Sequence, residues 1–380
     1  MENCRGVGKC SKFIKEQSEI KVKERIYVCH TFYHVYVSFL KEMNLPIEKR
    51  GKATLVISHM STDFGDFSER VRKSGFFEEV VDFDEKHERC FPELAKYRQK
   101  EKNFIKSTLN RIKFTKKFAR LQAEYIPVDF KQYRDIYVFC DSDPIGFYLN
   151  ANHIYYHAVE DGLNCLKNGD LAHLDNLNHF KIKAFLSQKC NLIFIQNGYS
   201  KYCIDMEVND ISVIAIPFEK YVEVPRKKLV EGLRREDKDL LLKVFVPDID
   251  KLKQAIQDNN VKTALVLTEP LCPDLSVRKQ IFEDIVERYK DEYMLVFKPH
   301  PRDELDYKKE FPDYQIIDKV VPMEMLNFIE GCKMDLAIGV FTELDALEFV
   351  KDRVRLGADF MDKYEDPSIH RFPDLTKCKH

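Results

Sequence analysis

The residues best suited to chemistry lie in the segment 294–302. Its apolar part, 294–297, predicts a buried strand, and the strand ends in the run KPHPR at 298–302. The two prolines prevent further strand pairing and stop the chain from continuing as a helix. An imidazole between two cations at the carboxyl end of a strand can bind an anion such as a phosphate and donate a proton to it. An ordinary strand-ending turn with a partly exposed histidine is the alternative interpretation.

A pair of acids follows another predicted strand. Glu160 and Asp161 precede Gly162, and the freedom of glycine permits a tight turn that projects an acid into a cleft. A neighbouring carboxylate raises the pKa of one member of such a pair, which suits a general base near neutral pH. The alternative is an acidic turn that caps the next helix.

Three further strand or helix ends lie in the second half of the chain. Thr342 is expected on a strand-to-helix turn, where free N–H groups and a hydroxyl suit a phosphate. Glu324, at a predicted helix start, could accept hydrogen bonds from ribose hydroxyls, and Thr268 is a weaker candidate for a nucleotide edge. A capping threonine and an acid favoured by the helix dipole are the structural alternatives. Together with the acid pair, these residues indicate a transferase with its nucleotide donor held in one domain and its base across the cleft.

The elements that must position these residues alternate between short apolar runs and helical stretches, which predicts parallel βαβ units. A charged helical segment, 226–253, separates two series of such units, so we expect an α/β chain with two Rossmann-like halves. Helices are expected to end near 43 and to lie near 67–73, 277–289 and 323–331. The predicted strands are 26–29, 54–57, 80–83, 135–139, 153–156, 192–195, 211–214, 264–267, 294–297, 315–317 and 335–338.

Length and composition limit the possible functions. A chain of 380 residues is too long for one simple core, and a net charge of −2 gives no general attraction for nucleic acid. The sequence has no apolar run of bilayer length and no apolar signal region in its first 24 residues, so we expect a cytoplasmic protein. The eleven cysteines suit buried thiols in a reducing compartment. Nicotinamide-binding and P-loop glycine patterns are absent from the sequence.

The segment from Lys96 to Arg120 is strongly basic. It holds ten Lys or Arg residues and one acid, Glu101, with apolar residues at roughly helical spacing. A basic amphipathic helix can lie on an anionic membrane surface, which would suit a lipid-linked acceptor. The alternative is a solvated helix that packs its apolar stripe on the first domain.

These motifs resemble those of bacterial sialyltransferases. The acid-acid-glycine run at 160–162 resembles their D/E-D-G motif, the run at 298–301 resembles their HP motif, and Thr342 resembles their Ser/Thr phosphate motif. The segments 29–34, 267–270 and 322–324 look like glycosyltransferase family 52, the lipooligosaccharide sialyltransferases. The similarity runs in order from about residue 25 to residue 350.

The resemblance implies a GT-B architecture, in which two Rossmann-like domains face a central cleft. It divides the chain into a basic lead-in at 1–24, an acceptor domain at 25–235 and a nucleotide-donor domain at 236–380 that ends in C-terminal helices. It implies inverting transfer from CMP-sialic acid to a glycan such as lipooligosaccharide or capsule, with no required metal and no cofactor. It is also compatible with a homodimer and with a peripheral position at the inner face of the cell membrane through 96–120.

The resemblance also implies roles for single residues. Asp161 would be the general base, and His300 would bind the leaving phosphate and act as the general acid. The expected donor-binding residues are Lys298, Pro299, Arg302, Thr268, Glu324 and Thr342, and those expected to support the base or the acceptor are Glu160, Gly162, Thr31 and His34. The family's phosphate motif usually has adjacent hydroxyl residues, whereas Thr342 stands alone, so backbone N–H groups would have to substitute. A UDP- or CDP-sugar transferase, an epimerase and a catalytically silent scaffold remain open.

Overall fold

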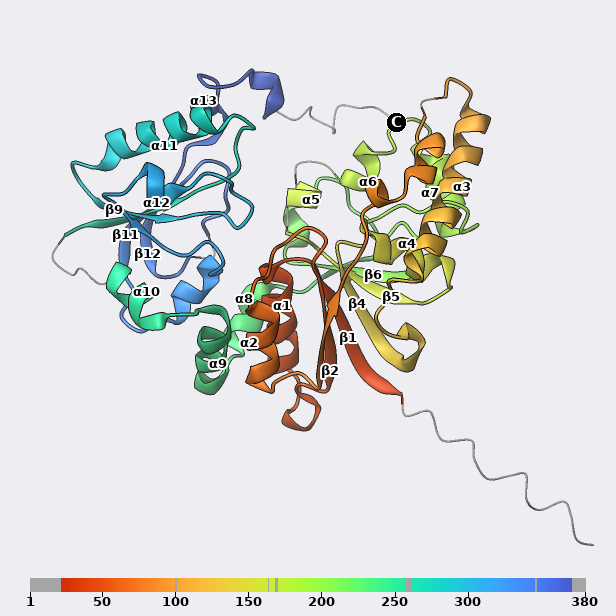
Figure 1. Ribbon diagram of the computed structural model, residues 1–380, viewed down its shortest axis with the longest axis horizontal. Helices are drawn as coiled ribbons and strands as arrows, with labels where there is room; N and C mark the ends of the chain where they lie inside the picture. The colour runs from red at the N-terminus through yellow and green to blue at the C-terminus, as the bar shows by residue number, and fades with distance from the viewer. Residues whose placement is uncertain are drawn as a thin grey trace, which may run out of the picture.

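The computed structural model describes residues 22–370, except 100, 163, 168–169, 257–260 and 346. The predicted lead-in at 1–24 therefore lies outside the described residues apart from its last three positions, and so does the tail from 371 onward. Figure 1 shows two lobes, each built around one sheet, with α8, α9 and α10 at their junction. We call β1–β7 with their helices the first unit, and β8–β12 with theirs the second unit.

Seven strands form the sheet of the first unit within the described residues, in the order β3-β2-β1-β4-β5-β6-β7. Every neighbouring pair in this sheet is parallel. The strands are β1 Lys23–Cys29, β2 Ala53–Ser58, β3 Glu79–Phe83, β4 Tyr133–Phe139, β5 Tyr156–Val159, β6 Cys203–Val208 and β7 Tyr221–Glu223.

Five strands form the sheet of the second unit within the described part of the chain, in the order β10-β9-β8-β11-β12, and these pairs are also parallel. The strands are β8 Thr263–Leu267, β9 Met294–Lys298, β10 Gln315–Ile316, β11 Met334–Gly339 and β12 Val350–Arg355. The predicted α/β fold class with two Rossmann-like halves is confirmed.

Helices connect the strands and cover the sheets (Figure 1). The α-helices are α1 Phe32–Met43, α2 Phe67–Ser74, α3 Phe104–Gln122, α4 Pro144–Ala151, α5 Asn164–Lys167, α6 Leu171–Leu174, α7 Phe180–Gln188, α8 Arg226–Glu231, α9 Arg235–Phe245, α10 Ile249–Ile256, α11 Leu275–Tyr289, α12 Tyr307–Glu310 and α13 Gly357–Met361. The 3-10 helices are η1 Ile47–Lys49, η2 Glu88–Cys90, η3 Pro92–Tyr97, η4 Phe130–Gln132, η5 Ile211–Val213, η6 Met323–Phe328 and η7 Pro367–Ile369. None of the helices in the described ranges is long and apolar enough to cross a membrane.

Several predicted elements of the first unit are wrong. The strand expected at 153–156 overlaps β5 only at Tyr156, and the strand expected at 211–214 is largely the 3-10 helix η5. Residues 192–195 form no strand, because Ile193 and Ile195 are buried in a small local cluster beside α6 instead of in the sheet. The real strands there, β6 and β7, are short and partly exposed, so polar residues interrupt the apolar runs on which the prediction depended.

The basic segment 96–120 contains the end of η3 and all of α3 except its last two residues. Phe114 and Phe118 are buried in a cluster with Phe91 and Leu94, so the second half of α3 packs on the first unit as the alternative interpretation expected. The first half leaves Ile105 exposed. Contact of this segment with a membrane stays a prediction.

Phe245, the last residue of α9, packs the segment between the two sheets against the first unit. Its ring lies 5.0 Å from that of Phe67 in α2 and 5.9 Å from that of Phe39 in α1, measured between centroids. The same apolar cluster continues to Leu326 of η6 in the second unit. The predicted domain boundary at 235–236 falls at the start of α9, so the core that contains Phe245 bridges the two units.

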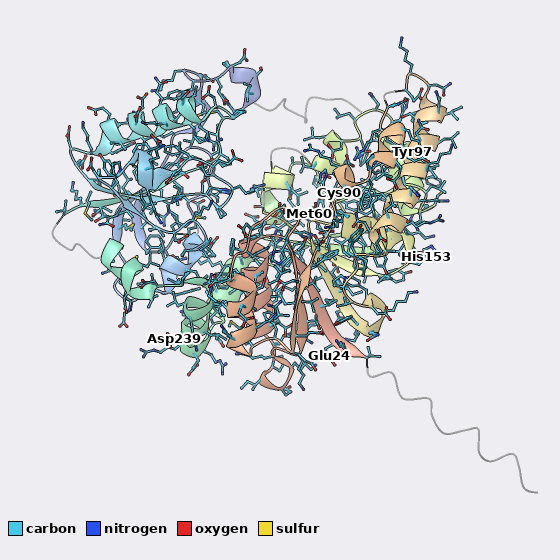
Figure 2. All side chains as sticks on the ribbon, viewed as in Figure 1. Glu24, Met60, Cys90, Tyr97, His153 and Asp239 are labelled. Carbon is cyan, nitrogen blue, oxygen red and sulfur yellow. The ribbon has the colours of Figure 1, made fainter. Side chains whose placement is uncertain are left out.

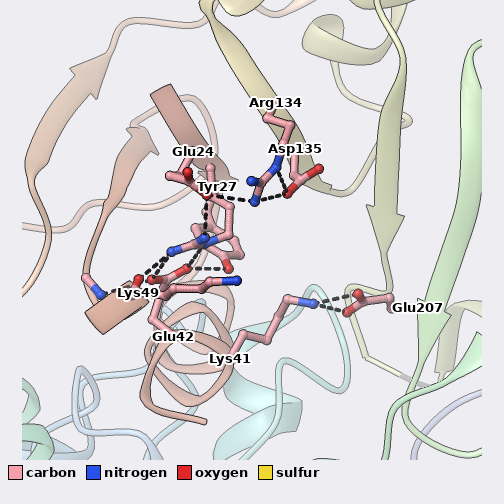
Figure 3. A network of polar contacts seen from close by, with 10 residues as sticks. Glu24, Tyr27, Lys41, Glu42, Lys49, Arg134, Asp135 and Glu207 are labelled. Carbon is pink, nitrogen blue, oxygen red and sulfur yellow. Dashed lines mark hydrogen bonds and ion pairs between the residues drawn. The ribbon is translucent and has the colours of Figure 1, made fainter. Parts of the chain in front are cut away.

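A buried ion pair fixes α1 on the first sheet (Figure 3). The guanidinium of Arg25 in β1 donates to both carboxylate oxygens of Glu42 in α1, at 2.6 and 3.1 Å. The same carboxylate accepts hydrogen bonds from the Tyr27 hydroxyl at 2.8 Å and the Gly51 N–H at 3.0 Å. With four donors satisfied inside the protein, Glu42 ties β1, α1 and the turn before β2 together.

We expect Glu42→Ala to lower the free energy of unfolding by about 3–5 kcal/mol, because the buried Arg25 loses its main ion-pair partner and keeps only Glu24, at 3.4 Å, as a counter-charge. Urea denaturation followed by circular dichroism measures this change. The matched control is Glu292→Ala, which breaks an exposed pair with Lys262 and should change stability by less than about 1 kcal/mol. Equal effects of the two substitutions would contradict the role of Glu42.

Candidate active site

The site of the first unit lies at the carboxyl ends of three neighbouring strands. Strands β1, β4 and β5 are adjacent and parallel, so the residues that follow them meet at one edge of the sheet. His30 follows β1, Asp141 and Asp143 come after β4, and Glu160 and Asp161 follow β5. The sequence predicted Glu160, Asp161 and His34 as site residues at this edge, but not His30, Asp141 or Asp143.

His34 holds the carboxylate of Asp161. The His30 N–H donates to His34 Nδ1 at 3.0 Å, so Nδ1 must be an acceptor and the ring proton must lie on Nε2. That Nε2 donates to Asp161 Oδ1 at 2.5 Å. Thr31 caps α1 by accepting the His34 N–H at 3.2 Å, and Phe139 stacks on the imidazole with 4.6 Å between centroids. Of the predicted supporting residues, His34 therefore contacts Asp161 directly, and Thr31 fixes the start of the helix that carries His34.

The contacts with His34 and Cys140 lower the pKa of Asp161, so its carboxyl group is ionised at neutral pH. Burial alone would raise the pKa of Asp161, but hydrogen bonds from His34 and Cys140 and the charge of Arg302 bring it below its usual value. Burial also lowers the pKa of His34. At neutral pH the pair is therefore a carboxylate and a neutral imidazole. The Asp161 side chain is 40% exposed, so a substrate can reach it.

The two neighbours of Asp161 in the chain, Glu160 and Gly162, have different roles. Gly162 has a φ of 105°, a left-handed value that confirms the turn expected of a glycine. Glu160 is only 1% exposed whereas the Asp161 side chain is 40% exposed, so Asp161 is the acid of the pair that projects. Burial raises the pKa of Glu160, and the nearby charge of Arg226 opposes this shift. Glu160 is therefore a buried neighbour of the base, whereas Asp161 is accessible to a substrate.

A second histidine, His30, was not predicted as a site residue. It is 1% exposed, its Nε2 contacts Glu85 Oε2 at 2.8 Å and its Nε2 lies 3.4 Å from Asp143 Oδ2. Burial lowers the pKa of His30, but these two carboxylates outweigh burial and raise it to about 9. His30 is therefore a buried cation among acids. Because Glu85 is 55 residues away in the chain, no sequence motif could have revealed the pair.

Cys140 completes the group around Asp161. It directly follows β4 and has a φ of 55°, a left-handed conformation that is unusual for a residue other than glycine. One ligand atom each from His34, Cys140 and Asp161 lie within 4.8 Å of one another, so these three could share a metal ion. An ion there would have to displace the His34 proton that now bonds Asp161. In this structure, His34 and Cys140 instead form hydrogen bonds with the Asp161 carboxylate.

In the second unit, residues 298–302, which we call the HP segment, begin at the last residue of β9. Lys298 is 5% exposed, and its ammonium donates to the carbonyls of Pro299 at 2.7 Å and Lys319 at 3.1 Å. Burial lowers its pKa to about 7, against the opposing charge of Glu324. Both cations thus lie near the histidine, but Lys298 is buried and its ammonium is used inside the protein, so Arg302 is the exposed one.

His300 repeats the arrangement of His34. Its Nδ1 accepts the Arg302 N–H at 3.1 Å, so Nε2 carries the ring proton and is free to donate to an anion. Burial, with the charges of Arg302 and Lys298, lowers the pKa of His300 to about 4. The imidazole is therefore neutral at pH 7 and suits a hydrogen-bond donor better than the expected general acid.

Thr268 positions His300. Its hydroxyl accepts the His300 N–H at 3.1 Å and donates to Asp303 at 3.0 Å. Asp303 also accepts hydrogen bonds from Arg278 at 2.6 Å and Tyr307 at 2.8 Å. Thr268 is buried and its hydroxyl is used inside the protein, so the expected contact with the donor is replaced by support of the HP segment.

The expected phosphate seat around Thr342 has a different form. Within the described residues no helix lies between β11 and β12, so the predicted strand-to-helix turn is wrong. Instead, the N–H groups of Val340, Phe341 and Thr342 converge on Glu269 Oε1 at 3.0, 2.9 and 2.9 Å. Three converging N–H groups form a cradle for an anion. We call it the N–H cradle, and a carboxylate of the chain itself occupies it.

Glu324 lies at the start of η6, which replaces the longer helix expected at 323–331. Burial raises its pKa, and the charge of Lys298 opposes that shift. The charge of Glu324 contributes to the raised pKa values of Tyr33 and Tyr36 in α1, so Glu324 lies near the first unit. The charge of Arg302 in the second unit likewise lowers the pKa of Asp161 in the first. The predicted residues of the two units are therefore within electrostatic range of one another.

The family assignment follows from the sequence match. The model of glycosyltransferase family 52 matches residues 77–341, more than half of the chain. The chain belongs to glycosyltransferase family 52. This confirms the resemblance carried by the motifs at 160–162 and 298–301, both of which lie inside the matched range. The chain's two parallel α/β halves agree with the expected GT-B class of fold.

Solved structures with a similar chain path include an α/β-galactoside α-2,3-sialyltransferase from the luminous marine bacterium Photobacterium phosphoreum. It is 12% identical, with 87% of this chain and 89% of that chain covered and a TM-score of 0.49. The UDP-GlcNAc 2-epimerase of Neisseria meningitidis is 10% identical, with coverage of 83% and 77% and a TM-score of 0.42. An uncharacterized protein of Haemophilus influenzae is 26% identical over 156 residues, which are 40% of this chain and 44% of that protein. The match thus spans less than half of that relative.

We expect His34→Ala to move the acidic limb of the pH–rate profile of sugar transfer to higher pH. Without the His34 hydrogen bond, burial dominates and the pKa of Asp161 rises, so the base is protonated over a wider acidic range. The profile of kcat/KM against pH measures this. His59→Ala is the control, since His59 pairs with the exposed Asp82. An acidic limb that stays in place in His34→Ala would show that His34 does not set the ionisation of Asp161.

Proposed function

We propose that the protein is an inverting sialyltransferase. It transfers sialic acid from CMP-sialic acid to a hydroxyl of a cell-surface glycan, such as lipooligosaccharide or capsule, and requires no metal. The observation that carries the proposal is the ionised, accessible Asp161, held by a neutral His34 and within electrostatic range of Arg302 in the other unit. The resemblance of its motifs to those of the lipooligosaccharide sialyltransferases agrees with this choice of sugar.

In this proposal Asp161 takes the proton of the acceptor hydroxyl while the oxygen attacks the anomeric carbon of the sugar. His34 cannot take the proton in its place, because its Nδ1 is engaged by the His30 N–H and its Nε2 already carries a proton. The C–O bond to the phosphate breaks as the new glycosidic bond forms, and CMP leaves from the opposite face. A single displacement of this kind inverts the anomeric configuration.

The second unit stabilises the leaving phosphate. His300 donates a hydrogen bond from Nε2, and the exposed Arg302 supplies positive charge where negative charge develops. Lys298, Pro299 and Thr268 hold the HP segment in place, and Glu324 accepts hydrogen bonds from the ribose. One exposed cation in the segment suits the single phosphate of CMP better than the diphosphate of a UDP-sugar.

Calorimetric binding of CMP, UDP, CDP and ADP to the purified protein tests this proposal. We expect selective binding of CMP that His300→Ala weakens at least tenfold, a loss of about 1.4 kcal/mol, which is usual for a hydrogen bond to a charged group. Asp161→Ala should abolish transfer and leave the affinity for CMP within about threefold of the wild-type value. Preference for a diphosphate nucleotide would favour a UDP- or CDP-sugar enzyme. Binding of CMP without any transfer or hydrolysis of the donor would favour a silent scaffold.

Glu269 competes with the donor phosphate for the N–H cradle in this proposal. We expect Glu269→Ala to tighten CMP binding several-fold, because the three N–H groups become free to bind the phosphate. Calorimetry measures the dissociation constant, with Glu292→Ala as a control for the loss of one acid in the same unit. Weaker CMP binding in Glu269→Ala than in the control would show that the phosphate does not enter the cradle.

A further inference from the structure

A small cavity of about 270 Å³ lies between α3 and the start of α7. Positively charged side chains line it, and among its described lining residues the single acid is Glu101. We propose that this cavity, which we call the α3–α7 pocket, binds a phosphate ester. The inference stands apart from the proposed function, because the pocket includes neither Asp161 nor any residue of the HP segment.

Three cations and a histidine face the pocket from both helices. Arg111 belongs to α3 and Lys102 precedes that helix, whereas Lys183 belongs to α7 and His179 is its N-cap residue. Burial and the charge of Arg111 lower the pKa of Lys183, so these two cations are near one another. Like charges that gather in one place repel each other. An anion bound among them would therefore stabilise the arrangement.

The protein itself supplies little counter-charge to these cations. None of the three cations forms an ion pair with a carboxylate of the described residues. Glu101 pairs instead with Lys106, at 2.8 Å. Arg111 donates to the side-chain oxygen of Asn176 and to the Phe194 carbonyl, and both of these acceptors are uncharged. The cations of the pocket thus remain available to an anionic ligand.

Neutral donors supplement the cations. Ser107 and Asn178 line the pocket with a hydroxyl and an amide, and both groups can donate to phosphate oxygens. No side chain caps the start of α7 at Phe180, so the positive end of the helix dipole adds to the charge of the cations. A phosphate ester presents several strong acceptor oxygens, so it can use donors from both helices at once.

A larger neighbouring cavity, of about 800 Å³, has the opposite balance of charge. Tyr97, labelled in Figure 2, lines it beside α3. Four acids face two arginines around that cavity. One of the acids is Asp175, which lies within electrostatic range of Arg111, a residue that lines both cavities. A phosphate is therefore attracted to the α3–α7 pocket and repelled by the larger cavity.

The phosphate ester has two possible sources, a soluble molecule or a lipid headgroup. Ile105 and Ile182, which are next in the chain to the lining residues Phe104 and Lys183, are 68% and 49% exposed. Exposed apolar side chains beside cations suit the surface of an anionic membrane. A soluble ester would need only the pocket. A comparison of vesicles with a soluble ester separates the two sources.

Titration calorimetry of the full chain with glycerol 3-phosphate, at constant ionic strength, tests the pocket, and glycerol is the uncharged probe. Flotation with vesicles of phosphatidylglycerol and phosphatidylcholine, against phosphatidylcholine alone, tests the lipid source. We expect Lys183→Ala and Lys102→Ala each to weaken binding of the phosphate probe about fivefold or more, the loss of one charge-assisted contact. The control is Lys131→Ala, at an exposed lysine outside the pocket, which should leave binding unchanged.

The same titrations in His300→Ala separate the pocket from the donor site. Binding of glycerol 3-phosphate that His300→Ala weakens and Lys183→Ala leaves unchanged would place the phosphate in the donor site and overturn the pocket. Binding to neither the soluble ester nor the anionic vesicles, or an equal loss in Lys131→Ala and Lys183→Ala, would also overturn it. Binding of CMP to the unmodified chain, measured in parallel, tests the proposed function separately, because the pocket can fail while CMP still binds and the reverse.

Discussion

The site depends on one hydrogen bond from the main chain. By donating to His34 Nδ1, the His30 N–H decides which ring nitrogen carries the proton, and that proton then holds the carboxylate of Asp161. A backbone donor fixed by β1 and the first turn of α1 cannot rotate away as a side chain can. The protonation of the base is thus set by the fold itself, through the junction of one strand and one helix.

The second unit uses the same arrangement for the opposite task. The N–H of Arg302 engages His300 Nδ1, so the Nε2 proton lies on the free side of the ring. In the first unit this proton stabilises a base that belongs to the protein, whereas in the second unit it remains available to a ligand. Thr268 and Asp303 stabilise the turn behind His300, so its direction is fixed before any ligand arrives.

Negative charge is concentrated at the edge of the first sheet, and this must be balanced. Asp143 and Glu85 lie beside the buried His30, whose raised pKa keeps it cationic. Without a buried cation, the acids near Asp161 would disfavour its ionised form. The N–H cradle reflects the same constraint in the second unit, where unpaired N–H groups need an acceptor and Glu269 supplies it.

The sequence by itself determined the class of fold and the strand ends at which Asp161 and His300 lie. Both follow from local patterns, because a buried parallel strand is an apolar run and a motif is contiguous. The short, half-exposed strands β6 and β7 lack that pattern and were missed. Only the tertiary structure decided the direction of each side chain and its partner. Lys298 turns inward, and Glu269 fills a cradle about 70 residues ahead of it in the chain, because these choices depend on what packs nearby and not on spacing in the sequence.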